Sequence, residues 1–301
     1  MSLENISIPS LDFDPRLDGL NVFADVFGSH TFEQWHEVWL EALSARSVMG
    51  VEFPTFPPTQ LQNRVHGHDS AVSLEEAGAL YRFACQHHLA GPSSPWFQSG
   101  AMLDFGSGWG RVLRYFMRDF PLKNIIGYEP SGLLAAVSRG HNPYVSFLNG
   151  SYLPDGMLAA NWFDFAISWS VYSHLPQNYV AAWLTETARV LKPGGAALYT
   201  TWGLRFLERL KVDAKRLHLG EDVHWYSQVC LQGAGDIDQR INDYKAGEFV
   251  WFDSLQNQQY GEAFISRDAL ENIIKTAELP LAIEVFDDVT LQQDAFVLRK
   301  V

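Results

Sequence analysis

Short apolar runs alternate with amphipathic stretches between about residues 97 and 202. The apolar runs have the length of buried strands, and they are Ala101–Phe105, Asn124–Tyr128, Val145–Leu148, Phe163–Ser168 and Ala196–Thr201. The stretches between them repeat apolar positions at helical spacing, and they are Arg111–Asp119, Leu133–Arg139 and Gln177–Leu191. Strands that alternate with helices at this spacing indicate βαβ units. We therefore predict an α/β domain with a parallel sheet in this part of the chain.

The chain before this region has a different pattern, and we predict that it is mostly helical. Thr31 and Gln34 have the spacing of a capping box, after which apolar residues recur every three or four positions. A proline-rich stretch follows and cannot continue that helix. Ser73 and Glu76 repeat the capping-box spacing, so they predict the start of a second helix.

The alternation also stops after Trp202. The next sixty or so residues are polar and aromatic, and their pattern leaves the structure open. A helix near Arg267–Ala277 follows, and then two apolar runs, Leu281–Phe286 and Ala295–Leu298, whose short connection favours an antiparallel pair of strands. The predicted divisions of the chain are a helical cap or lid at 1–95, a core domain at 96–202 and 263–301, and an insertion at 203–262.

Charge and composition narrow the classes of function. The 301 residues are 47% hydrophobic and 19% charged, which is typical of a globular protein. A net charge of −13 repels a phosphate backbone, and no run of Lys and Arg offsets it, so we expect no nucleic-acid partner. No apolar stretch reaches the roughly 18–20 residues of a membrane helix, and the first residues do not have the pattern of a signal peptide. Cys85 and Cys230 have no ligand or redox spacing, which suits a reduced, cytoplasmic location.

A glycine-rich loop follows the first predicted strand of the core and reads Asp104-Phe105-Gly106-Ser107-Gly108-Trp109-Gly110. Glycine lets the backbone turn tightly and approach a ligand closely, because it has no Cβ. The spacing is G-x-G-x-G, whereas the dinucleotide fingerprint is G-x-G-x-x-G. An acid just before the loop also suits an α-amino group better than a phosphate. The alternative for the loop taken by itself, which the spacing favours less, is an ordinary turn between a strand and a helix.

Polar residues also end the next two predicted strands. Glu129 ends the second strand, about twenty residues after the loop, where a carboxylate accepts hydrogen bonds from both hydroxyls of a ribose. Asn149, Gly150 and Ser151 end the third strand and are placed to meet a base. Because open α/β sheets bind ligands beyond the carboxyl ends of their strands, these three ends offer contacts for an amine, a ribose and a base.

Together these motifs resemble those of the class I S-adenosylmethionine-dependent methyltransferases. The family's first motif corresponds to Leu103–Gly110, and its ribose-binding acid corresponds to Glu129. Its fourth-strand motif corresponds to Phe163–Leu175, and its turn before the fifth strand corresponds to Leu191–Gly195. The resemblance covers about residues 97–202 and 262–301. It implies a Rossmann-like, seven-stranded, mostly parallel sheet with helices on both faces and an antiparallel final strand. It also implies S-adenosylmethionine as cofactor and S-adenosylhomocysteine as product.

The resemblance further implies a set of cofactor-binding residues. They are Asp104, Gly106, Ser107, Gly108, Gly110, Glu129, Pro130, Asn149, Gly150, Ser151, Ser168 and Trp169. Two positions depart from the family's pattern. Ser151 stands where an acid often contacts the adenine amino group, and Trp109 stands where smaller residues are common. Trp109 packs either beside the methionine part of the cofactor or on the first helix of the core.

No single catalytic residue follows from the motifs, because the cofactor supplies the activated group and the protein mainly aligns it with the acceptor. A general base is needed only for an uncharged hydroxyl or a protonated amine. His174 and Tyr172 follow the fourth strand and are the candidate catalytic residues; the alternatives are capping or packing for His174 and positioning for Tyr172. The stretch His66–Asp69 gives only a weak metal signal, so we expect no metal.

We predict that the parts of the chain outside the core select the acceptor. We expect them to cover the site and form an aromatic-lined pocket, with Arg64 reaching the cofactor's carboxylate; the alternative is that they stabilise the core or form a dimer contact. An acidic, aromatic chain without basic patches suits a small-molecule acceptor, to which we predict in-line methyl transfer. We expect no membrane partner, and a homodimer is left open. Two other functions stay open, a non-catalytic cofactor-binding module and a nicotinamide-dependent oxidoreductase. The glycine spacing and the Pro193-Gly194-Gly195 turn disfavour the oxidoreductase.

Overall fold

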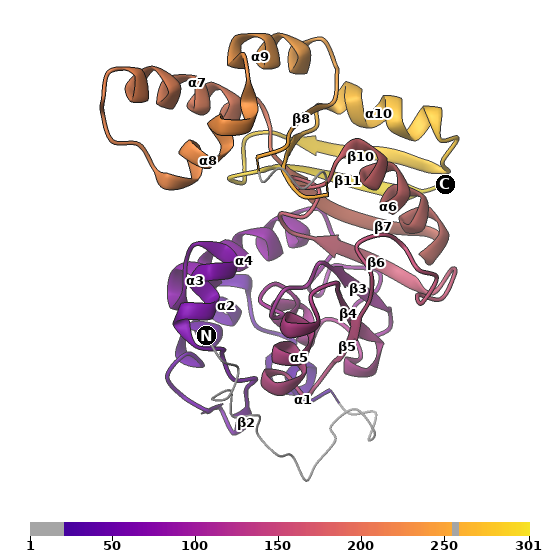
Figure 1. The fold of residues 1–301 in the computed structure, drawn as a ribbon. Coiled ribbons are helices and arrows are strands. Elements are labelled where there is room, and N and C mark those ends of the chain that lie inside the picture. The colour runs from indigo at the N-terminus through magenta and orange to yellow at the C-terminus, as the bar shows by residue number, and fades with distance from the viewer. Residues whose placement is uncertain (1–20, 255–258) are drawn as a thin grey trace. The chain divides into compact units, whose positions relative to one another are not determined.

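A computed structural model describes residues 21–254 and 259–301, and its main feature is a seven-stranded sheet (Figure 1). The order of neighbouring strands is β10 (Leu281–Asp287), β11 (Asp294–Lys300), β7 (Leu191–Thr201), β6 (Phe163–Ser168), β3 (Met102–Phe105), β4 (Ile125–Glu129) and β5 (Ser146–Asn149). β3 is parallel to β4 and β6, and β4 is parallel to β5, whereas β11 runs antiparallel to β7 and β10. The predicted seven-stranded, mostly parallel sheet with an antiparallel last strand is confirmed.

The chain forms two compact units. The first comprises the described residues up to Met157 together with Trp162–Ile167, and the second comprises Leu158–Asn161 together with the described residues from Ser168 onward. The first unit therefore holds the glycine loop and the N-terminal helices, and the second holds the insertion and the last hairpin. Among the described helices, none is both long enough and apolar enough to cross a membrane.

In the first unit, parallel registers place three strand ends at one edge. Phe105 of β3 pairs with Tyr128 of β4, and Glu129 pairs with Asn149 of β5. The four residues of β3 are all buried, as expected for a strand with neighbours on both sides. The residues that follow β3, β4 and β5 consequently share the edge where ligands bind in parallel sheets.

The N-terminal part of the first unit consists mainly of helices. They are α1 (Val22–Phe27), α2 (Phe32–Glu41), α3 (Thr59–His66) and α4 (Ser70–Gln86), with a hairpin of β1 (Ser47–Val48) and β2 (Val51–Glu52) after α2. The capping box of Thr31 and Gln34 is confirmed, with hydrogen bonds of 3.2 and 2.9 Å. The second predicted box is wrong, because α4 begins earlier and Ser73 lies inside it. The chain re-enters a helix within three residues of Gly67, whose φ of 76° ends α3.

Buried arginines fasten this N-terminal part to the core. Arg114 donates to the backbone carbonyls of Pro54 and Thr55 at 3.0 and 2.7 Å. Arg118 donates to two carbonyls around the end of α1, at 3.0 and 2.8 Å. Both arginines belong to η1 (Leu113–Arg118), which is a 3-10 helix and not the α-helix predicted for this stretch. Every residue of η1 is buried, so its contacts with the N-terminal part, and not an amphipathic periodicity, determine its conformation.

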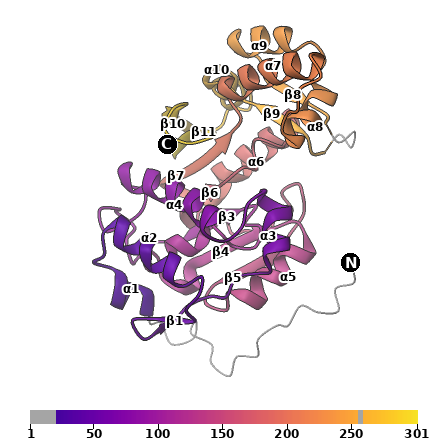
Figure 2. The ribbon, with the colours of Figure 1, turned by 90° about the vertical axis from the view of Figure 1, so that its left-hand side faces the viewer.

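The second unit combines β7, β10 and β11 with α6 (Gln177–Val190), α10 (Arg267–Thr276) and the insertion. The insertion, whose structure the sequence left open, is mostly helical. It contains α7 (Leu204–His218), α8 (Trp225–Ala234), α9 (Ile237–Lys245), β8 (Val250–Phe252) and β9 (Glu262–Phe264), and Figure 2 shows its three helices together. Leu207, Cys230, Ile241 and Phe252, one from each of these helices and from β8, belong to one hydrophobic cluster, so the insertion has a core of its own.

Candidate functional site

The glycine loop connects β3 with η1 and turns sharply. Gly106, Gly108 and Gly110 have φ values of 69°, 57° and 81°, in the left-handed region that favours glycine. The amide N–H of Gly106 donates to the carbonyl of Tyr128 at 2.8 Å and thereby holds the start of the loop on β4. The loop consequently places its backbone at the edge where the strands end.

Glu129 joins the glycine loop to the start of α5 (Gly132–His141). One carboxylate oxygen, Oε2, accepts a hydrogen bond from the amide N–H of Gly108 at 2.8 Å, and the other, Oε1, accepts one from Ser131 at 2.8 Å. Burial raises the pKa of Glu129, and these two N–H donors act in the opposite direction. Because a carboxylate has about four acceptor positions, Glu129 retains acceptor capacity for the hydroxyls of a ligand.

Asp104 is a second buried acid at the same edge, and it is 2% exposed. Burial and then Glu129 raise the pKa of Asp104 to about 7, while the amide N–H of Leu113 and the charge of Arg111 lower it. Its Oδ2 atom is buried and has no hydrogen-bond partner among the described residues. A cationic ligand group beside Asp104 would favour its ionised form, which agrees with the predicted contact to an amine.

The end of β5 is fixed by its own side chains. Asn149 donates through Nδ2 to the carbonyls of Glu129 and Pro130 at 2.9 and 3.0 Å. A Cβ on Gly150 would lie 2.0 Å from the ring of Tyr128, so only glycine fits without moving that ring. This segment is therefore tied to the chain that follows β4.

An acid that sequence reasoning missed lies beside Ser151. Oδ2 of Asp155 accepts a hydrogen bond from the amide N–H of Ser151 at 3.2 Å, and the hydroxyl of Tyr128 lies 3.1 Å from the same oxygen. The motif comparison expected an acid at the position of Ser151, whereas the chain places one four residues later. The only signal for it was the turn-forming Pro154-Asp155-Gly156.

Unpartnered polar atoms gather at the glycine loop. Buried side-chain atoms without a hydrogen-bond partner among the described residues include Oδ2 of Asp104, Oγ of Ser107, Nε1 of Trp109 and Nε2 of His66. Buried polar groups in folded proteins are nearly always satisfied. A local group of unsatisfied donors and acceptors therefore indicates a site for a ligand that carries both kinds of polar group.

The histidines of the N-terminal helices do not form a metal site with their neighbours. The ring of His66 lies 5.7 Å from that of Trp109, whereas His68 lies 3.8 Å from Glu76 and Asp69 accepts a hydrogen bond from α3. In the described ranges, no group of three His, Cys, Asp or Glu side chains is arranged to hold a metal ion.

The second unit begins with a strained turn after β6. Ser168 ends β6 with a buried Oγ that has no partner among the described residues, and Trp169 after it is half-buried. Ser170 has a φ of 59°, which is uncommon for a residue with a side chain. Its amide N–H donates to Oγ1 of Thr200 at 2.8 Å, which holds the turn. Strain of this kind is typical of functional sites, and here it directs the chain toward His174.

His174 is held in one orientation by the insertion. Its Nδ1 lies 2.9 Å from the carbonyl oxygen of Gly261, and its ring stacks on Tyr260 with 4.5 Å between ring centres. A carbonyl oxygen only accepts hydrogen bonds, so Nδ1 carries the proton and the lone pair of the neutral ring is at Nε2. The hydroxyl oxygen of Ser170 lies 3.5 Å from Nε2.

Glu262, which sequence reasoning did not identify, stands behind His174. Its Oε2 atom is 3.5 Å from Nδ1 of His174 and accepts hydrogen bonds from Trp202 at 2.9 Å and Tyr226 at 2.6 Å. Burial and then Glu262 raise the pKa of Tyr226, so this hydroxyl stays protonated and remains a donor. Tyr226 and Glu262 both come from the insertion, where the sequence pattern gave no structural signal.

Tyr172, the other candidate catalytic residue, is in the interior of the second unit. It is fully buried, stacks on Tyr199 at 4.7 Å and meets Phe296 edge to face. Burial raises the pKa of Tyr172 well above its usual value. These surroundings favour a role in packing and positioning.

The structure brings most of the predicted cofactor-binding residues to one edge. Those in the first unit are Asp104, Gly106, Ser107, Gly108, Gly110, Glu129, Pro130, Asn149, Gly150 and Ser151. Ser168 and Trp169 lie at the end of β6 in the second unit, and Tyr172 and His174 follow them in that unit. Arg64, predicted to reach the cofactor, is exposed on α3.

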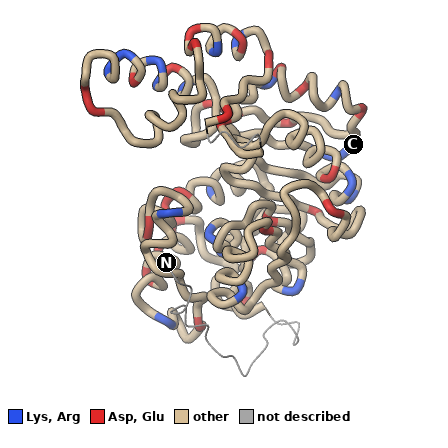
Figure 3. The backbone as a smooth tube through the Cα atoms, in the orientation of Figure 1, with Lys and Arg blue, Asp and Glu red and all other residues tan. Residues whose placement is uncertain are grey.

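Charge is mixed along the chain, and Figure 3 shows Lys and Arg most densely along α7. These basic side chains have acidic neighbours. Arg216 lies 3.0 Å from Glu221, Arg209 lies 3.7 Å from Asp213, and Lys211 pairs with Asp238. The basic residues of α7 are thus balanced locally, which does not favour a phosphate-binding surface.

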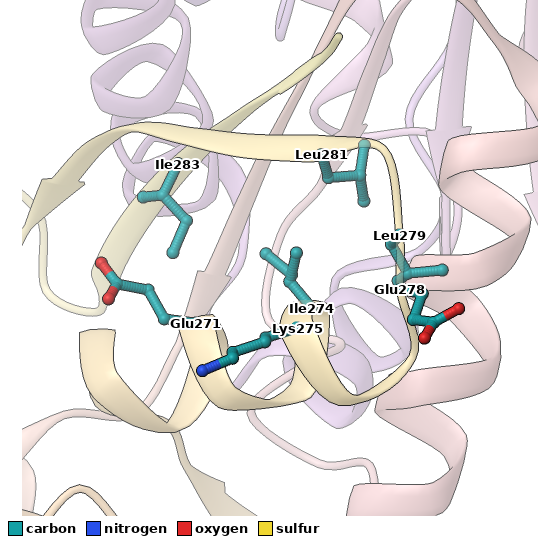
Figure 4. Close-up of a pocket in the computed structure, with 7 residues that line it drawn as sticks. All are labelled: Glu271, Ile274, Lys275, Glu278, Leu279, Leu281 and Ile283. Atoms are coloured by element: carbon teal, nitrogen blue, oxygen red, sulfur yellow. The ribbon is translucent and has the colours of Figure 1, made fainter.

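A separate pocket in the second unit contains none of the predicted site residues. Its volume is about 280 Å³, and it lies between α10 and the strand that follows it (Figure 4). Its lining residues are Glu271, Ile274, Lys275, Glu278, Leu279, Leu281 and Ile283. Four of these residues are aliphatic, and the other three, Glu271, Lys275 and Glu278, are charged.

Comparisons with known proteins identify the domain that contains the glycine loop. Residues 102–195 match the family model described as a methyltransferase domain. No curated protein matches the chain. An S-adenosylmethionine-dependent methyltransferase from Mesorhizobium loti has 14% identity and a TM-score of 0.48, over 75% of this chain and 99% of its own. One from Aquifex aeolicus has 13% identity and a TM-score of 0.46, over 82% of this chain and 100% of its own. Over residues 102–195 the chain is therefore similar to a methyltransferase domain.

Proposed function

We propose that this chain is an S-adenosylmethionine-dependent methyltransferase that transfers the methyl group in line to a small-molecule acceptor. The observation that supports the cofactor site best is the edge formed by the glycine loop and Glu129, with the unpartnered polar atoms around it. The cofactor carries an ammonium, a carboxylate, two ribose hydroxyls and an adenine. The donors and acceptors at this edge fit such a ligand.

Each part of the cofactor has a candidate partner in the first unit. Glu129, already oriented by two amide donors, is assigned to the ribose hydroxyls. Asp104 is assigned to the ammonium, because its unpartnered oxygen and raised pKa suit a cationic neighbour. Ser151 and Asp155 are assigned to the adenine, whose amino group needs an acceptor.

When bound, S-adenosylmethionine would supply a methyl group from its sulfonium. The electron pair of the broken carbon–sulfur bond would stay on sulfur. The residues of the chain have to hold the acceptor and keep it aligned, and alignment alone accounts for up to about 7–11 kcal/mol of a barrier. A hydroxyl or ammonium acceptor must also lose a proton. We assign this proton to Nε2 of His174, and the electron pair left on the acceptor forms the bond to the methyl carbon.

The surroundings of His174 support this assignment. The neutral ring has its lone pair at Nε2, and the carboxylate of Glu262, 3.5 Å from Nδ1, stabilises the ring once it is protonated. Tyr172 is assigned to positioning, through the packing around the turn that carries His174.

Charge and composition support a small acceptor. The net charge of −13 and the balanced charges of α7 disfavour RNA or DNA, and the aromatic residues of the insertion offer contacts for an organic molecule. We propose that the insertion selects this molecule. A homodimer and a cytoplasmic location remain predictions.

Incubation with methyl-labelled S-adenosylmethionine and cell extract fractionated by size tests the proposal. Enzyme-dependent label is expected in the small-metabolite fraction and is expected to fall when His174 is replaced by Gln. Label in protein or RNA would contradict the acceptor class. Cofactor binding without transfer to any fraction would favour a non-catalytic module instead.

A further inference from the structure

Helix α3 ends against the glycine loop. A Cβ on Gly108 would lie 3.7 Å from Cε1 of His66 and 3.9 Å from Cγ1 of Val65. The ring of His66 also lies 5.7 Å from the ring of Trp109, the next residue of the loop. The N-terminal part of the chain therefore places the side chains of α3 beside the loop assigned to the cofactor, with the ring of His66 against that of Trp109.

The imidazole of His66 is neutral, and its Nε2 nitrogen is unpartnered within the described part of the chain. Burial, followed by the charges of Arg111 and His68, lowers the pKa of His66 well below its usual value. Its Nε2 atom is buried without a hydrogen-bond partner among the described residues. A neutral imidazole nitrogen in this position either donates or accepts a hydrogen bond, and folded proteins seldom leave such an atom unsatisfied.

The end of α3 is held in place by its own hydrogen bonds. Gln62 donates to the carbonyl of Pro57 at 2.7 Å and accepts from the amide N–H of Ser70 at 3.1 Å, so it links both ends of the helix. Arg111, directly after the glycine loop, donates to the carbonyl of Ser73 at 3.0 Å and pairs with Glu76 at 2.6 Å. These bonds fix the helices on both sides of His66.

The charges on the two sides of the glycine loop differ. Asp104 and Glu129 are buried acids on the side of the strands, and they attract the cationic end of a ligand. On the side of α3, the charge of Arg111 acts together with burial to lower the pKa of His66. The same charge favours an anionic group beside His66, which can bind it in the tautomer that carries the proton at Nε2.

We propose that His66 is a cofactor-binding residue that donates a hydrogen bond from Nε2 to the carboxylate of S-adenosylmethionine. This inference rests on the proposed function, and it makes α3 a part of the cofactor site. The amino-acid end of the cofactor is bound from both sides, with its ammonium at Asp104 and its carboxylate at His66. Arg64, two residues earlier and exposed on α3, is not needed for this contact.

Calorimetric titration with two ligands tests the proposal. S-adenosylhomocysteine has the amino-acid end, whereas 5′-methylthioadenosine has the same nucleoside and sulfur without it. His66→Phe keeps a ring against Trp109 but removes the donor, so it is expected to weaken S-adenosylhomocysteine binding about 10-fold or more and to leave methylthioadenosine binding unchanged. His66→Gln restores a donor and is expected to recover most of the loss. His88→Phe, the matched change at an exposed position of the same unit, is expected to have no effect.

An equal loss for both ligands, or no loss for either, would overturn the assignment to the carboxylate. If His66→Phe does not fold, the ring nitrogens of His66 in the wild-type protein provide a second measurement by ¹⁵N NMR. The Nε2 resonance is expected to shift with S-adenosylhomocysteine and not with methylthioadenosine, and the absence of this difference would also overturn the proposal. Failure of the wild-type protein to bind either ligand would instead refute the proposed function.

Discussion

Replacement of Glu129 by Gln removes one charge from the proposed cofactor site with almost no change in shape. The carboxylate accepts hydrogen bonds from Gly108 and Ser131, each at 2.8 Å. An amide has only one oxygen, so its NH₂ group must face one of these two donors. The change therefore loosens the glycine loop and also removes the charged acceptor for the ribose.

The expected loss follows from the hydrogen bonds involved. A hydrogen bond to a charged group contributes about 1.5–3 kcal/mol, so Glu129→Gln is expected to weaken S-adenosylhomocysteine binding about 10- to 150-fold. Protonation of Glu129 also removes its charge and is therefore expected to weaken binding as Glu129→Gln does. Burial raises the pKa at which this protonation occurs. Wild-type affinity is therefore expected to fall as the pH drops through that pKa, and this pH dependence should be absent in Glu129→Gln.

Calorimetric titration of both proteins with S-adenosylhomocysteine measures this loss. Glu41→Gln is the matched control, because Glu41 is an exposed glutamate at the end of α2 in the same unit. Thermal unfolding shows whether Glu129→Gln is folded at the temperature of the titration. Unchanged affinity in a folded Glu129→Gln protein would refute the ribose role and the reasoning that places the cofactor at this edge.

Three further predictions concern the first unit. Asp104 has a folded-state pKa of about 7, above its usual 3.8, so its contribution to the free energy of unfolding falls as the pH rises from about 4 to 7. Asp104→Asn is expected to remove this pH dependence of the free energy of unfolding in denaturation curves, and an unchanged pH dependence would contradict the raised pKa. Arg114→Met leaves two backbone carbonyls without their donor and is expected to cost about 2–4 kcal/mol in urea denaturation, whereas a loss near zero would show that this tie is dispensable. Gly150→Ala drives a Cβ into the ring of Tyr128 and is expected to cost about 1–3 kcal/mol, measured in the same way; a wild-type stability would mean that the ring moves freely.

The local motifs and the family resemblance that they carry were sufficient to predict the sheet and the edge to which the cofactor is assigned. The glycine loop, Glu129 and the end of β5 each follow directly from a strand, so their order along the chain also gives their order at the sheet edge. The antiparallel last pair followed from the short connection between two apolar runs. The strand ends and the last hairpin depend on residues close together in the sequence, and the periodicity of apolar positions reports on such local structure.

Other features depend on contacts between distant segments and were not predictable. η1 is a buried 3-10 helix because Arg114 and Arg118 reach carbonyls of the N-terminal part, about 60 to 90 residues earlier. Glu262 approaches His174 across 88 positions, from a segment without a recognisable pattern. His66 suggested at most a weak metal signal in the sequence, and only its position against Gly108 reveals another role.

The start of α4 shows how a local signal misleads. Ser73 and Glu76 have the spacing of a capping box, but Ser73 is buried inside the helix and Glu76 pairs with Arg111. Glu76 forms an ion pair with Arg111, which follows the glycine loop, so its spacing from Ser73 was coincidental. Sequence spacing alone does not distinguish these two uses of the same residue.

The most direct test of the central claim is a calorimetric titration of the wild-type protein with S-adenosylhomocysteine, with reduced nicotinamide adenine dinucleotide as the comparison ligand. One molecule of S-adenosylhomocysteine is expected to bind per chain, and the dinucleotide is not expected to bind. Binding of the dinucleotide alone, or of neither ligand, would contradict the assignment of the glycine loop and Glu129 to S-adenosylmethionine.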